Sequence, residues 1–151
     1  MRRHRVLKVM ADGMPWLCDV GVGGPCPLRP LCLQEGIEQH QGDESYRLAK
    51  DPFLGGVVEE LRKGDWSHYY SFTEEVQLPL DYVMPSYWCE HAPDSIFTQS
   101  IMISVRTPDG RITVSGDEIR MFSRNGVKAF TPSSEAERVA ALQEWFGIVL
   151  D

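Results

Sequence analysis

The sequence lacks an apolar run long enough to cross a membrane, and its first residues contain no hydrophobic signal segment. Basic residues are also scarce, because 15 lysines and arginines stand against 22 aspartates and glutamates, a formal net charge of −7. This balance argues against a nucleic-acid partner or an anionic membrane surface. The one basic cluster, Arg2-Arg3-His4-Arg5, is short and is interpreted as a solvated terminus rather than a phosphate-attracting patch. We therefore expect a cytoplasmic protein that binds neither nucleic acid nor membrane.

Cysteine is sparse, and its arrangement predicts no metal centre. The four cysteines (Cys18, Cys26, Cys32 and Cys89) form no Cys-x-x-Cys pair, and their spacing matches no zinc motif. In a reducing compartment they are expected to be free thiols, mostly buried. Low-complexity segments and internal repeats are absent as well, whereas 42% of the residues are hydrophobic and 10% aromatic. A disordered chain is excluded on that composition, and 151 residues are enough for one domain or for a domain with a smaller appendage.

A predicted β-hairpin brings a histidine and an aspartate together near the start of the chain. Residues 5–10 and 15–20 are rich in apolar residues and flank Asp12-Gly13, a strong hairpin signal. If Asp12-Gly13 is the two-residue loop, Val6 lies opposite Asp19 and His4 is its diagonal neighbour; if the loop is one residue earlier, His4 lies directly opposite Asp19. Both registers put the two side chains on one face. The pair is either an ordinary surface contact or two members of a nucleophilic triad.

The rest of the chain favours strands followed by one helix. Strands are expected at residues 44–49, 57–62, 66–72, 97–106, 111–115, 118–124 and 127–130, with a short helix near 80–90 broken by Pro85. Ser134 and Glu137 form a capping box for a closing helix that ends near Gly147. His40 is expected in a solvated loop and His68 on a strand surface. The predicted fold is mixed α+β and mainly β: a small antiparallel β-barrel with an appended α/β part.

Several motifs, in one order along the chain, resemble the arylamine N-acetyltransferase family. They are Asp19-Val20-Gly21-Val22-Gly23-Gly24, Pro27-Leu28-Arg29-Pro30-Leu31, Tyr46-Arg47-Leu48, residues 66–72, residues 87–97 and residues 107–111. The resemblance covers nearly all of the chain. It implies a β-barrel domain over residues 1–75 that carries the His/Asp pair. It also implies remaining barrel strands and an α/β lid with a C-terminal helix over residues 76–151.

The resemblance also implies a chemistry. A cysteine thiolate would take the acetyl group from acetyl-coenzyme A and pass it to an arylamine or hydrazine, with His4 as base and Asp19 as the carboxylate that orients it. The resemblance places coenzyme A beside Gly23 and Gly24, with His91 and Ser95 as further cofactor contacts. Val22, where the family has phenylalanine, and Phe97 would line the substrate pocket.

The family's nucleophilic cysteine lies in an Arg-Gly-Gly-x-Cys motif ahead of the histidine, and this motif does not occur in the sequence. We therefore expect a truncated chain that lacks the helical domain with the cysteine, is inactive alone and self-associates through the surface left exposed. Cys26 follows the glycine loop and is a weaker candidate for a substitute nucleophile. The alternative function is a non-catalytic module that binds coenzyme A or another ligand, or that serves an interaction.

Overall fold

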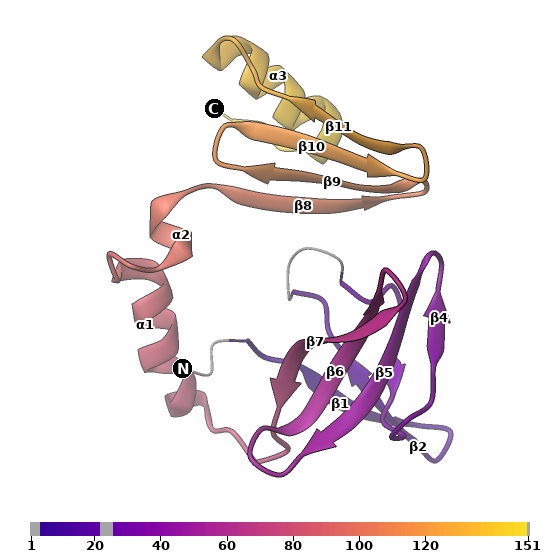
Figure 1. The fold of residues 1–151 in the computed structure, drawn as a ribbon. Helices are drawn as coiled ribbons and strands as arrows, with labels where there is room; N and C mark the ends of the chain where they lie inside the picture. The colour runs from indigo at the N-terminus through magenta and orange to yellow at the C-terminus, as the bar shows by residue number, and fades with distance from the viewer. Residues whose placement is uncertain (1–3, 22–25, 151) are drawn as a thin grey trace. The chain divides into compact units, whose positions relative to one another are not determined.

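Antiparallel strands dominate the structure, a computed structural model that describes residues 4–21 and 26–150 (Figure 1). Strands account for 44% of the described residues and helices for 20%, which confirms the mainly β class. The chain forms two units, Met1–Tyr82 and Val83–Asp151. The domain limits predicted from the sequence, 1–75 and 76–151, stay a prediction, because a division by contacts does not show that either part is an independent domain.

The first sheet of unit 1 contains the predicted N-terminal hairpin. Strands β1 (Leu7–Ala11), β2 (Met14–Cys18) and β3 (Leu31–Cys32) lie in the order β1-β2-β3. Asp12 and Gly13 both have positive φ, 52° and 73°, as a type I′ hairpin turn requires. This turn fixes the register with Ala11 opposite Met14 and Leu7 opposite Cys18, so Asp12-Gly13 is the loop.

The second sheet of unit 1 has four antiparallel strands in sequence order. These are β4 (Gln39–Gln41), β5 (Glu44–Asp51), β6 (Gly55–Arg62) and β7 (Asp65–Phe72). The register of β6 and β7 shifts between Val58 and Glu59, a local irregularity that adds twist. His68 lies exposed on β7, as predicted. His40 lies on β4 rather than in a loop, with Nδ1 2.8 Å from the Ser45 hydroxyl.

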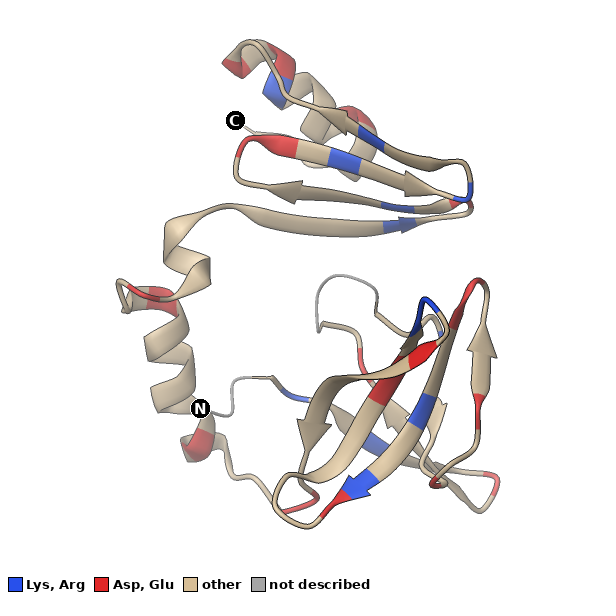
Figure 2. Cartoon of the chain, viewed as in Figure 1, with Lys and Arg blue, Asp and Glu red and all other residues tan. Residues whose placement is uncertain are grey.

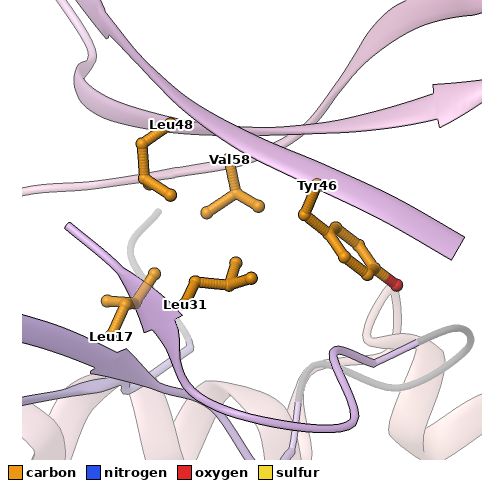
Figure 3. Close-up of a cluster of buried hydrophobic side chains, with 5 residues drawn as sticks. All are labelled: Leu17, Leu31, Tyr46, Leu48 and Val58. Carbon is orange, nitrogen blue, oxygen red and sulfur yellow. The ribbon is translucent and has the colours of Figure 1, made fainter. Parts of the chain in front are cut away.

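The two sheets of unit 1 share one hydrophobic core. Leu17 and Leu31 come from the first sheet, and Tyr46, Leu48 and Val58 come from the second; each is at most 4% exposed. Figure 3 shows these side chains meeting between the strands. Removing each of them from water contributes about 1.5–3 kcal/mol to folding, so this cluster holds the two sheets together.

The predicted small antiparallel β-barrel is not confirmed, because the described strands form no closed barrel. The two sheets of unit 1 each end in edge strands (β1 and β3, β4 and β7). An isolated parallel bridge between Glu35 and Leu48 connects the segment after β3 to β5. Closure requires a continuous ladder around the whole circumference, and the two-residue β3 is too short to provide one. Alternating apolar residues predict a buried face but do not specify whether the sheet closes.

Unit 2 consists of two short helices followed by a sheet and a longer helix. Its elements are α1 (Val83–His91), α2 (Ile96–Gln99), β8 (Met102–Thr107), β9 (Gly110–Ser115), β10 (Glu118–Ser123), β11 (Gly126–Phe130) and α3 (Glu135–Phe146). The four strands form one antiparallel sheet in the order β11-β10-β9-β8. Ala141 and Leu142 of α3 pack against Val114 and Ile119 of this sheet, which covers one of its faces.

Two expectations for the region before β8 were wrong. Pro85 does not break the helix: it is the third residue of α1, in the first turn, where a missing N–H removes no helical hydrogen bond. The one-turn 3₁₀ helix η1 (Pro79–Tyr82) precedes α1. Residues 97–99, the start of the strand expected over 97–106, belong instead to α2 (Ile96–Gln99), because the Ser95 hydroxyl caps this helix by accepting from the Phe97 N–H.

The closing helix α3 begins and ends as predicted. The Ser134 side chain accepts a hydrogen bond from the Glu137 N–H, and Gly147 ends the helix with φ 67°. The Glu137 carboxylate accepts from the N–H and hydroxyl of Ser133 rather than closing the usual box on Ser134, and these bonds lower the pKa of Glu137. Within the described residues, no helix is both long and apolar enough to span a membrane. Figure 2 shows charges of both signs interspersed along the strands of both units.

Candidate functional site

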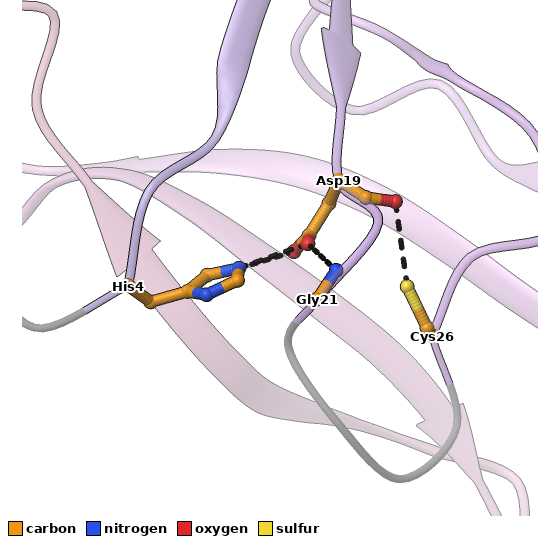
Figure 4. A network of polar contacts seen from close by, with 4 residues as sticks. All are labelled: His4, Asp19, Gly21 and Cys26. Atoms are coloured by element: carbon orange, nitrogen blue, oxygen red, sulfur yellow. Dashed lines mark hydrogen bonds and ion pairs between the residues drawn. The ribbon is translucent and has the colours of Figure 1, made fainter. Parts of the chain in front are cut away.

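His4 and Asp19 form the predicted pair at the end of the β1–β2 hairpin. Continuing the register of β1 and β2 by one residue puts Val6 opposite Asp19, and His4 is on the same face as Val6. The His4 Nε2 atom lies 2.8 Å from one Asp19 carboxylate oxygen and 2.9 Å from the other (Figure 4). The Asp12-Gly13 turn therefore positions His4 and Asp19 on one face, because it determines the register of β1 against β2.

The Asp19 carboxylate is buried, with 2% of its side chain exposed, whereas the His4 side chain is 33% exposed. The Gly21 N–H donates to the same carboxylate, with 3.0 Å between N and Oδ1 (Figure 4). An ionised carboxylate only accepts hydrogen bonds, so the proton in the His4–Asp19 contact belongs to Nε2. In a neutral ring Nδ1 is then the unprotonated nitrogen, and it makes no hydrogen bond to any residue that the structure describes.

Tyr70 of β7 lies beside both members of the pair. Its ring packs edge-on against the His4 imidazole, with 5.9 Å between the ring centroids and 76° between the planes. Its hydroxyl is buried and close to Asp19, although it forms no well-aligned hydrogen bond within the described residues. Burial, followed by the Asp19 charge, raises the pKa of Tyr70, so the phenol stays neutral.

Sequence reasoning missed two groups at this site. Tyr70 is 51 residues from Asp19, and no local pattern indicates that β7 passes the end of the hairpin. Gly21 has a local signal, because an aspartate commonly accepts a hydrogen bond from the backbone N–H two residues on. A Cβ on Gly21 would lie 3.7 Å from the His4 ring, an ordinary contact distance.

Cys26 lies near the pair but points elsewhere. Its thiol donates to the backbone carbonyl of Asp19, with 3.4 Å between Sγ and O, on the side away from the imidazole (Figure 4). This contact gives no support to Cys26 as a substitute nucleophile. Among the described residues, no group of three or more histidine, cysteine or acidic side chains could hold a metal ion.

The other residues predicted to contact the cofactor or the substrate do not lie beside the His4–Asp19 pair in the described part of unit 1. Val22, Gly23 and Gly24 lie outside the described residues. His91, Ser95 and Phe97 belong to unit 2. His91 ends α1, where its Nδ1–H donates to the Tyr87 carbonyl at 3.0 Å.

The His91 ring also stacks on Tyr87, with 4.3 Å between centroids, and remains exposed. Phe97 is 58% exposed. Ser95, by contrast, is fully buried, and its hydroxyl donates to the Cys89 carbonyl at 2.8 Å while it caps α2. These bonds give Ser95 a structural role, and its predicted contact with the cofactor has no support in the geometry.

Comparisons with known proteins agree over the whole chain. A family model described as N-acetyltransferase matches residues 1–151. An arylamine N-acetyltransferase of Mycobacterium tuberculosis is 32% identical over 147 residues, which is 96% of this chain and 52% of that protein.

Solved structures agree as well. The arylamine N-acetyltransferase structure from Salmonella typhimurium matches with a TM-score of 0.90 and 27% identity, over 98% of this chain and 54% of that one. The Mycobacterium marinum structure in complex with CoA matches with a TM-score of 0.88 and 30% identity, over 98% of this chain and 55% of that one. This chain therefore spans about half the length of the relatives that it matches.

Proposed function

Because the chain belongs to the arylamine N-acetyltransferase family, we propose that His4 and Asp19 are the base and the orienting carboxylate of a Cys-His-Asp acetyl transfer. The acetyl donor is acetyl-CoA and the acceptor is an arylamine. The observation that carries this proposal is the bond from His4 Nε2 to the buried Asp19 carboxylate, because it leaves Nδ1 as the ring nitrogen that can accept a proton.

The first half-reaction forms an acetyl-enzyme. A cysteine thiol gives its proton to His4 Nδ1, and the thiolate attacks the thioester carbonyl of acetyl-CoA. The bond between the carbonyl carbon and the CoA sulfur breaks, and the proton on Nδ1 passes to the departing CoA thiolate. Asp19 stabilises the imidazolium that exists between these two proton transfers.

In the second half-reaction the cysteine sulfur becomes the leaving group, and His4 again accepts a proton. The amine nitrogen of the acceptor attacks the acetyl-cysteine carbonyl, His4 Nδ1 takes a proton from that nitrogen, and the cysteine sulfur leaves. The products are the N-acetylated amine and the ion pair of thiolate and imidazolium, ready for the next acetyl-CoA. Through both steps the proton stays on Nε2 and remains hydrogen-bonded to the Asp19 carboxylate, so one imidazole orientation serves the whole cycle.

The nucleophile in this proposal comes from outside these 151 residues. The printed sequence contains no Arg-Gly-Gly-x-Cys, and the relatives contain nearly as many residues again as those matched here. We propose that the 151-residue chain alone is inactive and that a further segment, which carries the cysteine, completes the site. We also propose that the protein is cytoplasmic. The Mycobacterium marinum relative with bound CoA supports acetyl-CoA as the acetyl donor, and the exposed His91 ring remains a candidate contact for the coenzyme.

The experiment joins this chain to the part of the Mycobacterium tuberculosis relative that it does not match and measures CoA release from acetyl-CoA in the presence of an aniline. We expect turnover by the fusion and none by the 151-residue chain. His4→Gln should abolish turnover in the fusion, and His68→Gln on the exposed surface of β7 should leave it unchanged.

A fusion that turns over equally well with His4→Gln would refute the role of His4. A fusion with the unchanged sequence that binds CoA but produces no CoA from acetyl-CoA would favour the non-catalytic binding module instead. A thiol assay for acetylated cysteine separates the two half-reactions, because loss of the base should prevent even the first.

A further inference from the structure

His4 lies beyond the paired part of its strand. The ladder between β1 and β2 begins at Leu7, so residues 4–6 have no strand partner among the described residues. The hydrogen bonds of a ladder hold a backbone in place, and strand ends without them fray. The imidazole that contacts Asp19 therefore belongs to a stretch of backbone that the hairpin alone does not fix.

Two contacts with the segment that follows β7 hold this part of the chain. Lys8 of β1 forms an ion pair with Glu74. Closer to the site, the Arg5 guanidinium lies over the Tyr82 ring, with 4.7 Å between Cζ and the ring centroid. All four residues belong to unit 1. The segment after β7 therefore contacts β1 and also the residues that precede it.

Arg5 and His4 anchor the same stretch of backbone from opposite sides. The two residues are neighbours in the chain, and continuing the alternation of β1 turns their side chains to opposite faces. On one side, the His4 imidazole contacts the Asp19 carboxylate at 2.8 Å and the Tyr70 ring at 5.9 Å between centroids. On the other side, Arg5 contacts Tyr82. Loss of either anchor would leave the backbone of residue 4 held from one side only.

Tyr82 is a suitable anchor because the backbone before it is ordered by hydrogen bonds. It ends the 3₁₀ helix η1, in which the Asp81 carboxylate accepts from the Leu78 N–H at 2.7 Å. The Asp81 N–H in turn donates to the Leu78 carbonyl at 2.9 Å. The Tyr82 side chain is half-buried, which limits its own motion. A planar guanidinium stacks well on such a ring and is attracted by its quadrupole.

We propose that Arg5 is a positioning residue for His4: its contact with Tyr82 holds the backbone of residues 4–6, so that the imidazole stays on the Asp19 carboxylate. This inference rests on the proposed role of His4 as the base. It gives the segment after β7 a part in the site, although that segment touches neither the imidazole nor the carboxylate through this contact.

Hydrogen exchange of the His4 Nε2 proton in the 151-residue chain tests the proposal, measured by NMR as saturation transfer from water. Without the Arg5 contact, residues 4–6 should detach more often, and each detachment exposes this proton to solvent. Arg5→Met and Tyr82→Leu should each raise the exchange rate about two- to fivefold, the size of an exposed cation–π contact. Tyr82→Phe should leave the rate unchanged, because the ring remains. Combining Arg5→Met with Tyr82→Leu should have no larger effect than one of them, because both remove the same contact.

Arg47→Met is the matched control. The Arg47 guanidinium lies over the Trp66 ring at 4.4 Å, so the variant removes the same kind of contact within unit 1. Arg47 follows the core residue Tyr46 on β5 and is therefore turned away from the core. This variant should leave the exchange rate of the His4 proton unchanged. Circular dichroism confirms that each variant folds.

Tyr82→Leu separates the contact from the charge, because it removes the ring and keeps the Arg5 cation. A rise in exchange with Arg5→Met alone would assign the effect to the lost charge beside the imidazole and overturn the positioning role. Unchanged exchange in both variants, or an equal rise with Arg47→Met, would overturn it as well. The measurement needs no nucleophile, so a fusion without turnover would contradict the proposed function and leave this result standing.

Discussion

Replacing Asp19 by asparagine tests the central claim about the site without needing the nucleophile. The Gly21 N–H donates to Oδ1, so it should hold the amide oxygen of the asparagine at that position. The amide nitrogen then takes the place of Oδ2, 2.9 Å from His4 Nε2. Because an amide nitrogen only donates, a protonated Nε2 would face another donor there, even though the amide oxygen is also within 2.8 Å of it. We therefore expect the equilibrium to shift toward the ring that is unprotonated at Nε2 and protonated at Nδ1.

The magnitude follows from the bond that is lost. A hydrogen bond to a charged acceptor contributes about 1.5–3 kcal/mol, which corresponds to a factor of about 10 to 150. A wrong tautomer adds to this, because Nδ1 can no longer accept the thiol proton; the same exchange in a serine protease triad costs about 10⁴-fold in kcat. In the fusion with the cysteine segment we therefore expect Asp19→Asn to lower kcat by about 10²- to 10⁴-fold.

The direct assay is nitrogen NMR of the imidazole at a pH where the ring is neutral, with His4→Gln used to assign the signal. The wild-type chain should show the tautomer protonated at Nε2, and Asp19→Asn the tautomer protonated at Nδ1. Asp12→Asn, in the turn of the same hairpin, is the control, because asparagine tolerates the φ of 52° at that position. An Asp19→Asn chain that keeps its proton on Nε2 would refute the reasoning.

Two further predictions concern stability. Gly110→Ala should lower the free energy of unfolding by about 2 kcal/mol or more, because its Cβ would lie 2.0 Å from the Phe122 carbonyl oxygen. Gly64→Ala, also at positive φ but in open space, should cost about 1 kcal/mol or less in the same urea titration, and equal costs would contradict the clash. Burial raises the pKa of Tyr70, so the unfolded phenol ionises first, and stability should fall as the pH rises above the ordinary value of 10.0. Tyr70→Phe should lessen that fall by at most about 1.4 kcal/mol per pH unit, whereas the exposed Tyr87→Phe should not.

The sequence predicted those parts of the fold that depend on local chemistry. Asp12-Gly13 predicts a two-residue hairpin loop, and that loop alone places His4 and Asp19 on one face. Ser134 and Gly147 predict the limits of α3 in the same local way. The His–Asp contact is therefore short-range information, although it joins residues 15 positions apart.

The features that sequence reasoning missed depend on packing between distant segments. Tyr70 meets His4 because β7 crosses the end of the first sheet, and only the shared core of the two sheets determines that crossing. Barrel closure is the same kind of question, since alternating residues show which face is buried and not which edges pair. Ile96 and Phe97 are typical of a strand, but the buried Ser95 hydroxyl caps a helical turn instead.

Asp19 connects the two kinds of information. Its position comes from the hairpin register, whereas its burial comes from the packing of unit 1 and of Tyr70. A buried carboxylate without partners would be costly, and here the Gly21 N–H and the His4 ring satisfy it. The pairing therefore stabilises the fold whether or not a nucleophile is present. It follows that the imidazole is oriented before any thiol arrives, so joining the cysteine segment should restore acetyl transfer without rearranging the hairpin.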